Sequence, residues 1–154
     1  MPAAKVKAYL DQQGIKYVSI QHSAAFTAPE IAASAHVSGR DFAKTVIIMN
    51  EDEMAMVVLP ASRRVLLSDL REMLESSHVR LASEAEFKDR FPDCELGAMP
   101  PLGNLYGMKT YVSGNLAEER EIAFNAGTHT EVIKLSYDDY ERLVQPTVLD
   151  FITT

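Results

Sequence analysis

Lys44 stands at the start of an apolar and β-branched run, residues 45–49, which is typical of a buried strand. Residues two apart in a strand point to the same face, so Lys44 would share its face with Phe42, Val46 and Ile48. A strand end favours a lysine whose stem covers apolar atoms while its ammonium stays in water. The alternative is a cation at the rim of a pocket, where it binds an anion or polarises an oxygen.

The stretch GAMPPLG, residues 97–103, is a second candidate for chemistry. Glycine and proline in such density are most often a surface loop. The alternative is a rigid loop, because Pro100 and Pro101 restrict the backbone while Gly97 lets it approach a ligand closely. Backbone N–H groups within residues 97–101 could then bind an oxyanion without any special side chain.

A third candidate is the turn that Gly127 and Thr128 form between two predicted strands, with His129 directly after it. The plainer interpretation is a hairpin turn that carries an exposed histidine. The alternative is a second loop that faces the same cleft, with His129 offering a hydrogen-bond donor to a substrate.

Several kinds of chemistry are not expected. The sequence has no Gly-rich phosphate loop, no G-x-S-x-G elbow and no H-E-x-x-H motif. The four histidines lack metal-ligand spacing, so neither a metal nor another cofactor is expected; they are His22, His36, His78 and His129. Cys94 is more typical of an inert thiol than of a nucleophile, and a single cysteine favours a cytoplasmic location.

Length and charge set the class of protein. The 154 residues fit one domain, residues 1–154, and no apolar run approaches the roughly 20 residues that span a bilayer. With 22 acidic against 15 basic residues the net charge is −7, so binding along DNA or RNA is not expected. Contact with a single nucleotide end is compatible with this charge.

The elements that would position these residues are strands interspersed with helices. Strands are expected at 15–21, 42–50, 54–60, 79–82, 108–113, 120–125 and 130–135. Helices are expected at 2–13, 27–35, 68–76, 83–91 and 136–144. Their predicted caps are Thr27 with Glu30, Ser68, Ser83 with Glu86, and Ser136. Leu70, Met73 and Leu74 would form the inner face of the third helix. This pattern predicts an α+β fold with a mixed sheet.

The ordered set of a strand-opening lysine, a G-x-x-x-P loop and a strand–Gly-Thr–strand turn resembles the YbaK/prolyl-tRNA-synthetase-associated-domain family. The likeness runs from about residue 15 to residue 145 and matches Lys44, Gly97, Pro101 and the turn 127–129. Members of this family are aminoacyl-tRNA editing proteins that hydrolyse mischarged tRNA. The resemblance therefore implies a mixed, partly closed sheet surrounded by helices.

The resemblance also implies roles for residues. HSAAFTA, residues 22–28, falls where family members form the aminoacyl side-chain pocket, so Phe26 and Thr27 are expected to bind substrate. Gly97, Ala98 and Pro101 would form the loop that stabilises the oxyanion. Lys44 would bind the 3′ end of the tRNA. Met99, Gly127, Thr128 and His129 would contact the substrate.

Members that clear alanine from proline tRNA often carry asparagine directly after the lysine, where this chain has Thr45. EIAFNAG, residues 121–127, resembles stand-alone members that act on other small amino acids. The resemblance therefore does not give the amino acid.

The predicted function is hydrolysis of mischarged aminoacyl-tRNA in trans. No residue stands out as a general base, so the 2′-hydroxyl of the substrate is expected to relay the proton. The alternative is a binding module that keeps the pocket without turnover. Because the chain is acidic, a synthetase or an elongation factor is expected to supply further affinity for tRNA.

Overall fold

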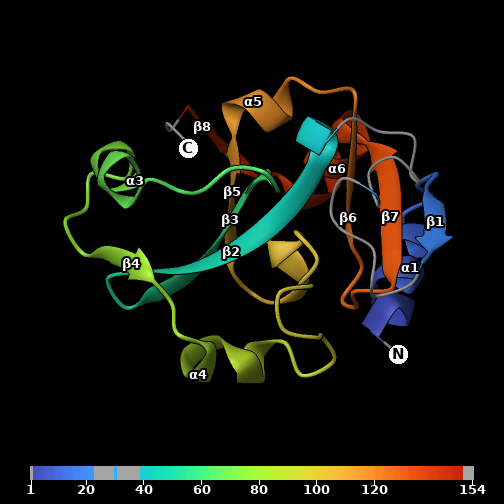
Figure 1. Cartoon of the computed structure of the whole chain (residues 1–154), viewed down its shortest axis with the longest axis horizontal. Helices are drawn as coiled ribbons and strands as arrows, with labels where there is room; N and C mark the ends of the chain where they lie inside the picture. Colours follow the sequence, from blue (N-terminus) through green and yellow to red (C-terminus); the bar gives the residue numbers. More distant parts are fainter. Residues whose placement is uncertain (1, 23–29, 31–38, 151–154) are drawn as a thin grey trace.

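The computed structural model describes residues 2–22, 30 and 39–150, which form an eight-stranded mixed sheet with helices around it (Figure 1). The strand order is β1-β7-β6-β2-β3-β5-β8, and β4 also pairs with β2. The strands are β1 Val18–Gln21, β2 Phe42–Asn50, β3 Glu53–Pro60, β4 Val79–Leu81, β5 Lys109–Ser113, β6 Glu121–Asn125, β7 Glu131–Ser136 and β8 Thr147–Leu149. The predicted α+β class and mixed sheet are confirmed.

The sheet consists of two parts that meet at β2 and β6. Strands β2 and β3 form the predicted hairpin and pair from Ala43↔Pro60 to Asn50↔Glu53. In contrast, β2 and β6 are parallel and pair only at Phe42↔Ala123 and Ala43↔Phe124. Beyond these pairs the strands diverge, and Figure 1 shows β6 and β7 running steeply past the diagonal β2. The sheet therefore splits directly after Ala43.

Helices lie around the sheet. They are α1 Pro2–Gln12, α3 Leu67–Met73, α4 Glu84–Phe87, α5 Gly114–Ala117 and α6 Tyr137–Val144, with 3-10 turns η1 Gly39–Asp41, η2 Lys88–Arg90 and η3 Gly103–Leu105. No helix of the described residues is both long enough and apolar enough to cross a membrane. The helix predicted at 27–35, with its Thr27 cap, lies largely outside the described residues.

Two of the predicted helix caps are confirmed. Ser83 accepts from the N–H of Glu86 at 3.3 Å while Glu86 accepts from the N–H of Ser83 at 2.8 Å, which is a full capping box. Ser136 accepts from the N–H of Asp139 at 3.1 Å and begins α6. These caps were predictable because each depends on residues within one turn of the chain.

Other local predictions are wrong. Ser68 is not a cap, since α3 begins one residue earlier and its N-cap, Leu66, makes no side-chain hydrogen bond. Leu70 is buried, as expected, but Met73 is 40% exposed and does not lie on the inner face. The helix predicted to reach residue 91 is α4 followed by the 3-10 turn η2. Neither α5 nor β8 was predicted.

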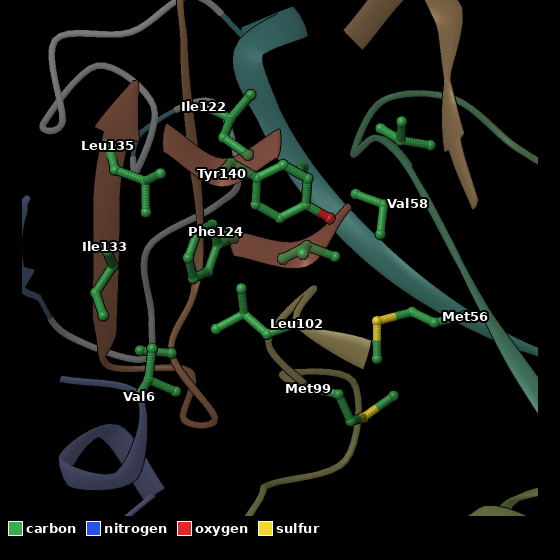
Figure 2. Close-up of a cluster of buried hydrophobic side chains, with 14 of the residues drawn as sticks. Val6, Met56, Val58, Met99, Leu102, Ile122, Phe124, Ile133, Leu135 and Tyr140 are labelled. Atoms are coloured by element: carbon green, nitrogen blue, oxygen red, sulfur yellow. The ribbon is translucent and has the colours of Figure 1, made fainter. Parts of the chain in front are cut away.

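Both faces of the central strands are covered, which is why β2 and β3 read as nearly continuous apolar runs. The larger core cluster packs on the face that Ala43 and Ile47 present, and Figure 2 shows part of it. A second cluster packs on the opposite face, which includes Val46, Ile48 and Leu59. The labelled members of the larger cluster are Val6, Met56, Val58, Met99, Leu102, Ile122, Phe124, Ile133, Leu135 and Tyr140.

Candidate active site

Lys44 is the first residue of β2 beyond its pairing with β6. Its partner across the β2–β3 hairpin is Leu59, which is fully buried in the second cluster. Alternation along the strand places Lys44 on the same face as Val46 and Ile48, as the sequence predicts. The lysine is half-buried at the point where the sheet splits.

No carboxylate of the described residues neutralises the ammonium group of Lys44. Burial lowers its pKa from the ordinary value, and the charge of Arg64 lowers the pKa further. Within the part of the chain that the structure describes, no carboxylate forms an ion pair with Lys44. A partly desolvated cation with no counter-charge is suited to binding an anion or a polar oxygen.

The 97–103 loop is buried along most of its length, so the interpretation as a surface loop is wrong. The Ala98 side chain is 1% exposed, and Met99 is 7% exposed within the larger core cluster. The hydroxyl of Tyr140, on α6, donates to the carbonyl of Pro101 at 2.7 Å. The core therefore fixes this loop through both its side chains and its backbone.

The backbone of this loop offers two N–H groups. Gly97 has φ +81°, in the left-handed region that favours glycine. The N–H of Ala98 donates within the loop to the carbonyl of Glu95 at 3.1 Å. In the described residues the N–H groups of Gly97 and Met99 make no hydrogen bond. Gly97 and Met99 are thus the residues whose N–H groups can donate to a ligand.

Backbone hydrogen bonds hold the 127–129 turn against the loop that precedes Met99. The N–H of Gly127 donates to the carbonyl of Ala98 at 2.9 Å, and the N–H of Glu95 donates to the carbonyl of Gly127 at 2.8 Å. The structure therefore brings together two of the three segments that the sequence singled out.

The side chain of Glu95 joins the same two segments. Its carboxylate accepts from the hydroxyl of Thr128 at 2.6 Å and from the N–H of His129 at 3.5 Å. The hydrogen bond from Thr128 is the main cause that lowers the pKa of Glu95, with smaller contributions from His129. Sequence reasoning missed Glu95, because an acid in a loop carries no local signal of this role.

The side chain of His129 is also hydrogen-bonded to the segment that precedes Gly97. Its Nε2 lies 2.6 Å from the carbonyl oxygen of Leu96, and a carbonyl only accepts, so Nε2 carries the proton. The ring also faces Gly97, where an added Cβ would lie 3.5 Å from His129 Cε1. This nitrogen therefore positions the loop and is not available as a base.

Cys94 lies beside this assembly as a protonated thiol. Its Sγ is 3.5 Å from the hydroxyl of Tyr106, and burial raises the pKa of the thiol. A raised pKa leaves little thiolate, which is the nucleophilic form. The geometry agrees with the inert interpretation of this cysteine.

A pocket of about 350 Å³ opens next to the Glu95–Thr128 contact. The buried carboxylate in its wall, Glu131, already has partners, since Ser19 donates to it at 2.5 Å and Lys7 forms an ion pair with it. In the described part of the chain no group of three or more His, Cys, Asp or Glu residues could hold a metal ion.

Lys44 lies near the start of β2, and the paired loops lie beyond the end of β6. Because Ala43 pairs with Phe124 in parallel, Lys44 lies level with Asn125, which is two residues before Gly127. Lys44 and Met99 nonetheless belong to opposite faces of β2, and the described residues show no contact between them. Phe26 and Thr27 lie outside the described residues.

Comparison with known proteins identifies the family. Residues 22–143 match the model of the aminoacyl-tRNA editing domain. The class that the fold and site define is therefore that of the aminoacyl-tRNA deacylases. The chain belongs to the aminoacyl-tRNA editing domain family, as the resemblance predicts.

Relatives and solved structures cover nearly the whole chain. It is 28% identical over 153 residues to the multifunctional Ser/Thr-tRNA deacylase ProXp-y of Escherichia coli K12, spanning 96% of this chain and 90% of that protein. A candidate trans-editing enzyme for prolyl tRNA synthetase superposes with a TM-score of 0.83 at 19% identity, covering 97% and 96% of the two chains. The structure of hypothetical protein APE2540 superposes with a TM-score of 0.82 at 20% identity, covering 97% of this chain and 99% of that chain. These two structures share the fold.

Proposed function

We propose that this protein is a trans-editing hydrolase that deacylates mischarged aminoacyl-tRNA at the end of the sheet where β2 and β6 separate. The observation that carries the proposal is the register of these strands. It places Lys44 level with the end of β6, which leads into the turn that is bonded to the Gly97 loop. The proposed site combines this cation with the backbone donors of the loop that is hydrogen-bonded to the turn after β6.

The proposed reaction is hydrolysis of an ester. A water oxygen attacks the aminoacyl carbonyl carbon, and the N–H groups of Gly97 and Met99 stabilise the oxyanion that forms. The bond to the ribose oxygen then breaks, and that oxygen takes a proton. Ala98 has no free N–H for this role, which differs from the expectation from sequence. Lys44 anchors the phosphate or ribose of the tRNA 3′ end.

The proton transfer is assigned to the substrate. His129 Nε2 donates a hydrogen bond to the Leu96 carbonyl and Cys94 is a thiol, so neither of these two atoms can take the proton of the attacking water. The 2′-hydroxyl of the terminal adenosine lies next to the ester and can accept the proton of the attacking water while it donates its own to the leaving oxygen. Removal of the 2′-hydroxyl should therefore abolish turnover while leaving binding intact.

Serine and threonine are the first amino acids to test. The Escherichia coli relative is a Ser/Thr-tRNA deacylase, and this supports the choice at 28% identity without fixing it. A synthetase or an elongation factor remains the proposed source of further tRNA affinity, and a cytoplasmic location remains a prediction. Neither proposal depends on the chemistry above.

The direct experiment incubates the purified protein with tRNAs mischarged with alanine, serine, threonine and other small amino acids. We expect hydrolysis above the spontaneous rate for at least one of them. Thermal stabilisation by an aminoacyl-adenosine mimic without any hydrolysis would instead identify a binding module. No hydrolysis and no stabilisation would reject both functions.

A further inference from the structure

The amide of Asn125 at the end of β6 has an oxygen that nothing in the described residues satisfies. Its Oδ1 is buried and has no hydrogen-bond partner. Buried polar atoms are nearly always paired, because an unpaired acceptor costs the folded protein free energy. Such an exception is expected where a ligand supplies the missing donor.

The register places this amide beside Lys44. Phe42 and Ala123 are paired and pack together in a small cluster with Val132, and Asn125 pairs with Val132. Two residues further along each strand, the same face carries Lys44 on β2 and Asn125 on β6. Lys44 and Asn125 are therefore the next residues on that face of their strands, at the point where the strands begin to separate.

These two groups do not satisfy each other. No hydrogen bond joins Lys44 to Asn125, and within the described ranges Lys44 has no ion pair. A molecule that fits both must offer an acceptor to the ammonium and a donor to the amide oxygen. The neighbouring ammonium would repel a second cation, which favours a hydroxyl donor over an ammonium donor.

We propose that Asn125 is a substrate-binding residue whose Oδ1 accepts a hydrogen bond from a hydroxyl of the aminoacyl end of the tRNA. This inference rests on the proposed function and names a contact within it. The hydroxyl comes either from the terminal ribose or from the side chain of a seryl or threonyl group. Lys44 holds the acceptor groups of the same end.

The test compares Asn125→Leu and Asn125→Ala with wild type on seryl-, threonyl- and alanyl-tRNA. Leucine keeps most of the volume and alanine does not, so together they separate loss of the oxygen from loss of shape. We expect kcat/KM to fall by about ten- to a hundredfold, the effect of losing one substrate hydrogen bond. Asn50→Leu is the matched control, because Asn50 lies at the far end of β2.

The pattern across substrates identifies the source of the hydroxyl. A loss confined to seryl- and threonyl-tRNA assigns it to the amino-acid side chain, while an equal loss on alanyl-tRNA assigns it to the ribose. The melting temperature should hold or rise, since each variant removes an unpaired buried oxygen. Unchanged kinetics on all three substrates, or a loss of activity that follows a loss of stability, overturns the proposal.

The inference can also be tested if wild type hydrolyses none of the tRNAs, a result that would reject the proposed function. Adenosine that carries a 3′-seryl group through an amide cannot be hydrolysed as an ester. It should raise the melting temperature of wild type and of Asn50→Leu, and raise that of Asn125→Leu much less. Equal shifts in the three proteins would reject the role of Asn125.

Discussion

Lys44 is a cation that the fold holds in an unfavourable place. It is half-buried, near the charge of Arg64, and no carboxylate of the described residues pairs with it. Its pKa is therefore below the unfolded value, so the charged form destabilises the folded state at neutral pH. This penalty disappears as the pH rises through the unfolded pKa. Such strain is typical of groups that are kept for function.

Lys44→Met should separate function from stability. Methionine keeps the stem of the side chain and removes the charge, so the melting temperature at pH 7 should hold or rise. Deacylation should fall by one to three orders of magnitude, in the range of about 2–4 kcal/mol for one electrostatic contact. Rate assays and thermal melts check both expectations. A variant with full turnover would return Lys44 to the role of a snorkelling lysine.

Glu95 acts through Thr128 and His129 and is expected to be a positioning residue. Glu95→Ala should lower kcat about tenfold with little change in KM, because the loop loses an anchor without losing a substrate contact. Thr128→Val removes the other partner of the same 2.6 Å bond. The double variant should be no worse than the worse single variant, as expected for one shared interaction. Additive losses would mean that the two side chains act separately.

The elements show which features the chain encodes locally. The caps at Ser83 and Ser136, the β2–β3 hairpin and most of the strands along the chain follow from patterns that lie within a few residues of one another. β8 was missed because three residues after Pro146 form a strand only by pairing with β5. The burial of the 97–103 loop was missed for the same reason, since Tyr140 and the core come from distant segments.

Substitution of Gly97 tests whether the 97–103 loop takes part in catalysis. A side chain there would be strained by φ +81°, at a cost of about 1–2 kcal/mol, although space for a Cβ exists 3.5 Å from the His129 ring. Gly97→Val should therefore lower the melting temperature and abolish most hydrolysis. Gly97→Asn should retain more of both, because asparagine tolerates this conformation.

Gly14→Ala is the matched control for this loop. Gly14 also has a positive φ, +69°, and no atom within 4 Å of an added Cβ. It should lose stability for the same backbone reason while its activity per folded molecule stays normal. If Gly97→Val behaved like Gly14→Ala, the loop would have no part in catalysis.

The whole molecule is acidic, but two arginines lie close to Lys44. A turn in which the N–H of Arg63 donates to the carbonyl of Pro60 places Arg63 and Arg64 just beyond the end of β3. Both are exposed, and in the described ranges neither forms an ion pair. With a net charge of −7, favourable contact with tRNA should be confined to this end of the sheet.

Arg64→Ala should weaken the dependence of KM on salt. Each phosphate contact with single-stranded nucleic acid contributes about 0.7 to the slope of log affinity against log salt, so the slope should fall by about that amount. Lys109→Ala changes the net charge equally, but Lys109 pairs with Ala55 at the other end of β3. Its slope should match wild type. Identical slopes for all three proteins would place the RNA elsewhere.

At the scale of the whole molecule, the sequence predicted the fold and the segments proposed for the site, but not how these segments are placed relative to one another. Lys44, Gly97 and the 127–129 turn were found because glycine and an isolated lysine stand out in a sequence. Asn125 and Glu95 were not found, because their importance depends on the β2–β6 register and on contacts across 33 residues of chain. Such information exists only once the strands are paired.

The two residue pairs between β2 and β6 also have a mechanical meaning. Among the described residues they are the whole ladder that joins β1, β7 and β6 to the rest of the sheet, so we expect the sheet to open most easily between β2 and β6. A tRNA end that binds both Lys44 on β2 and Asn125 on β6 would link the two parts of the sheet and oppose their separation. Amide hydrogens in β6 and β7 should then exchange with solvent more slowly when the aminoacyl-adenosine mimic is bound, while those in β3 should hardly change.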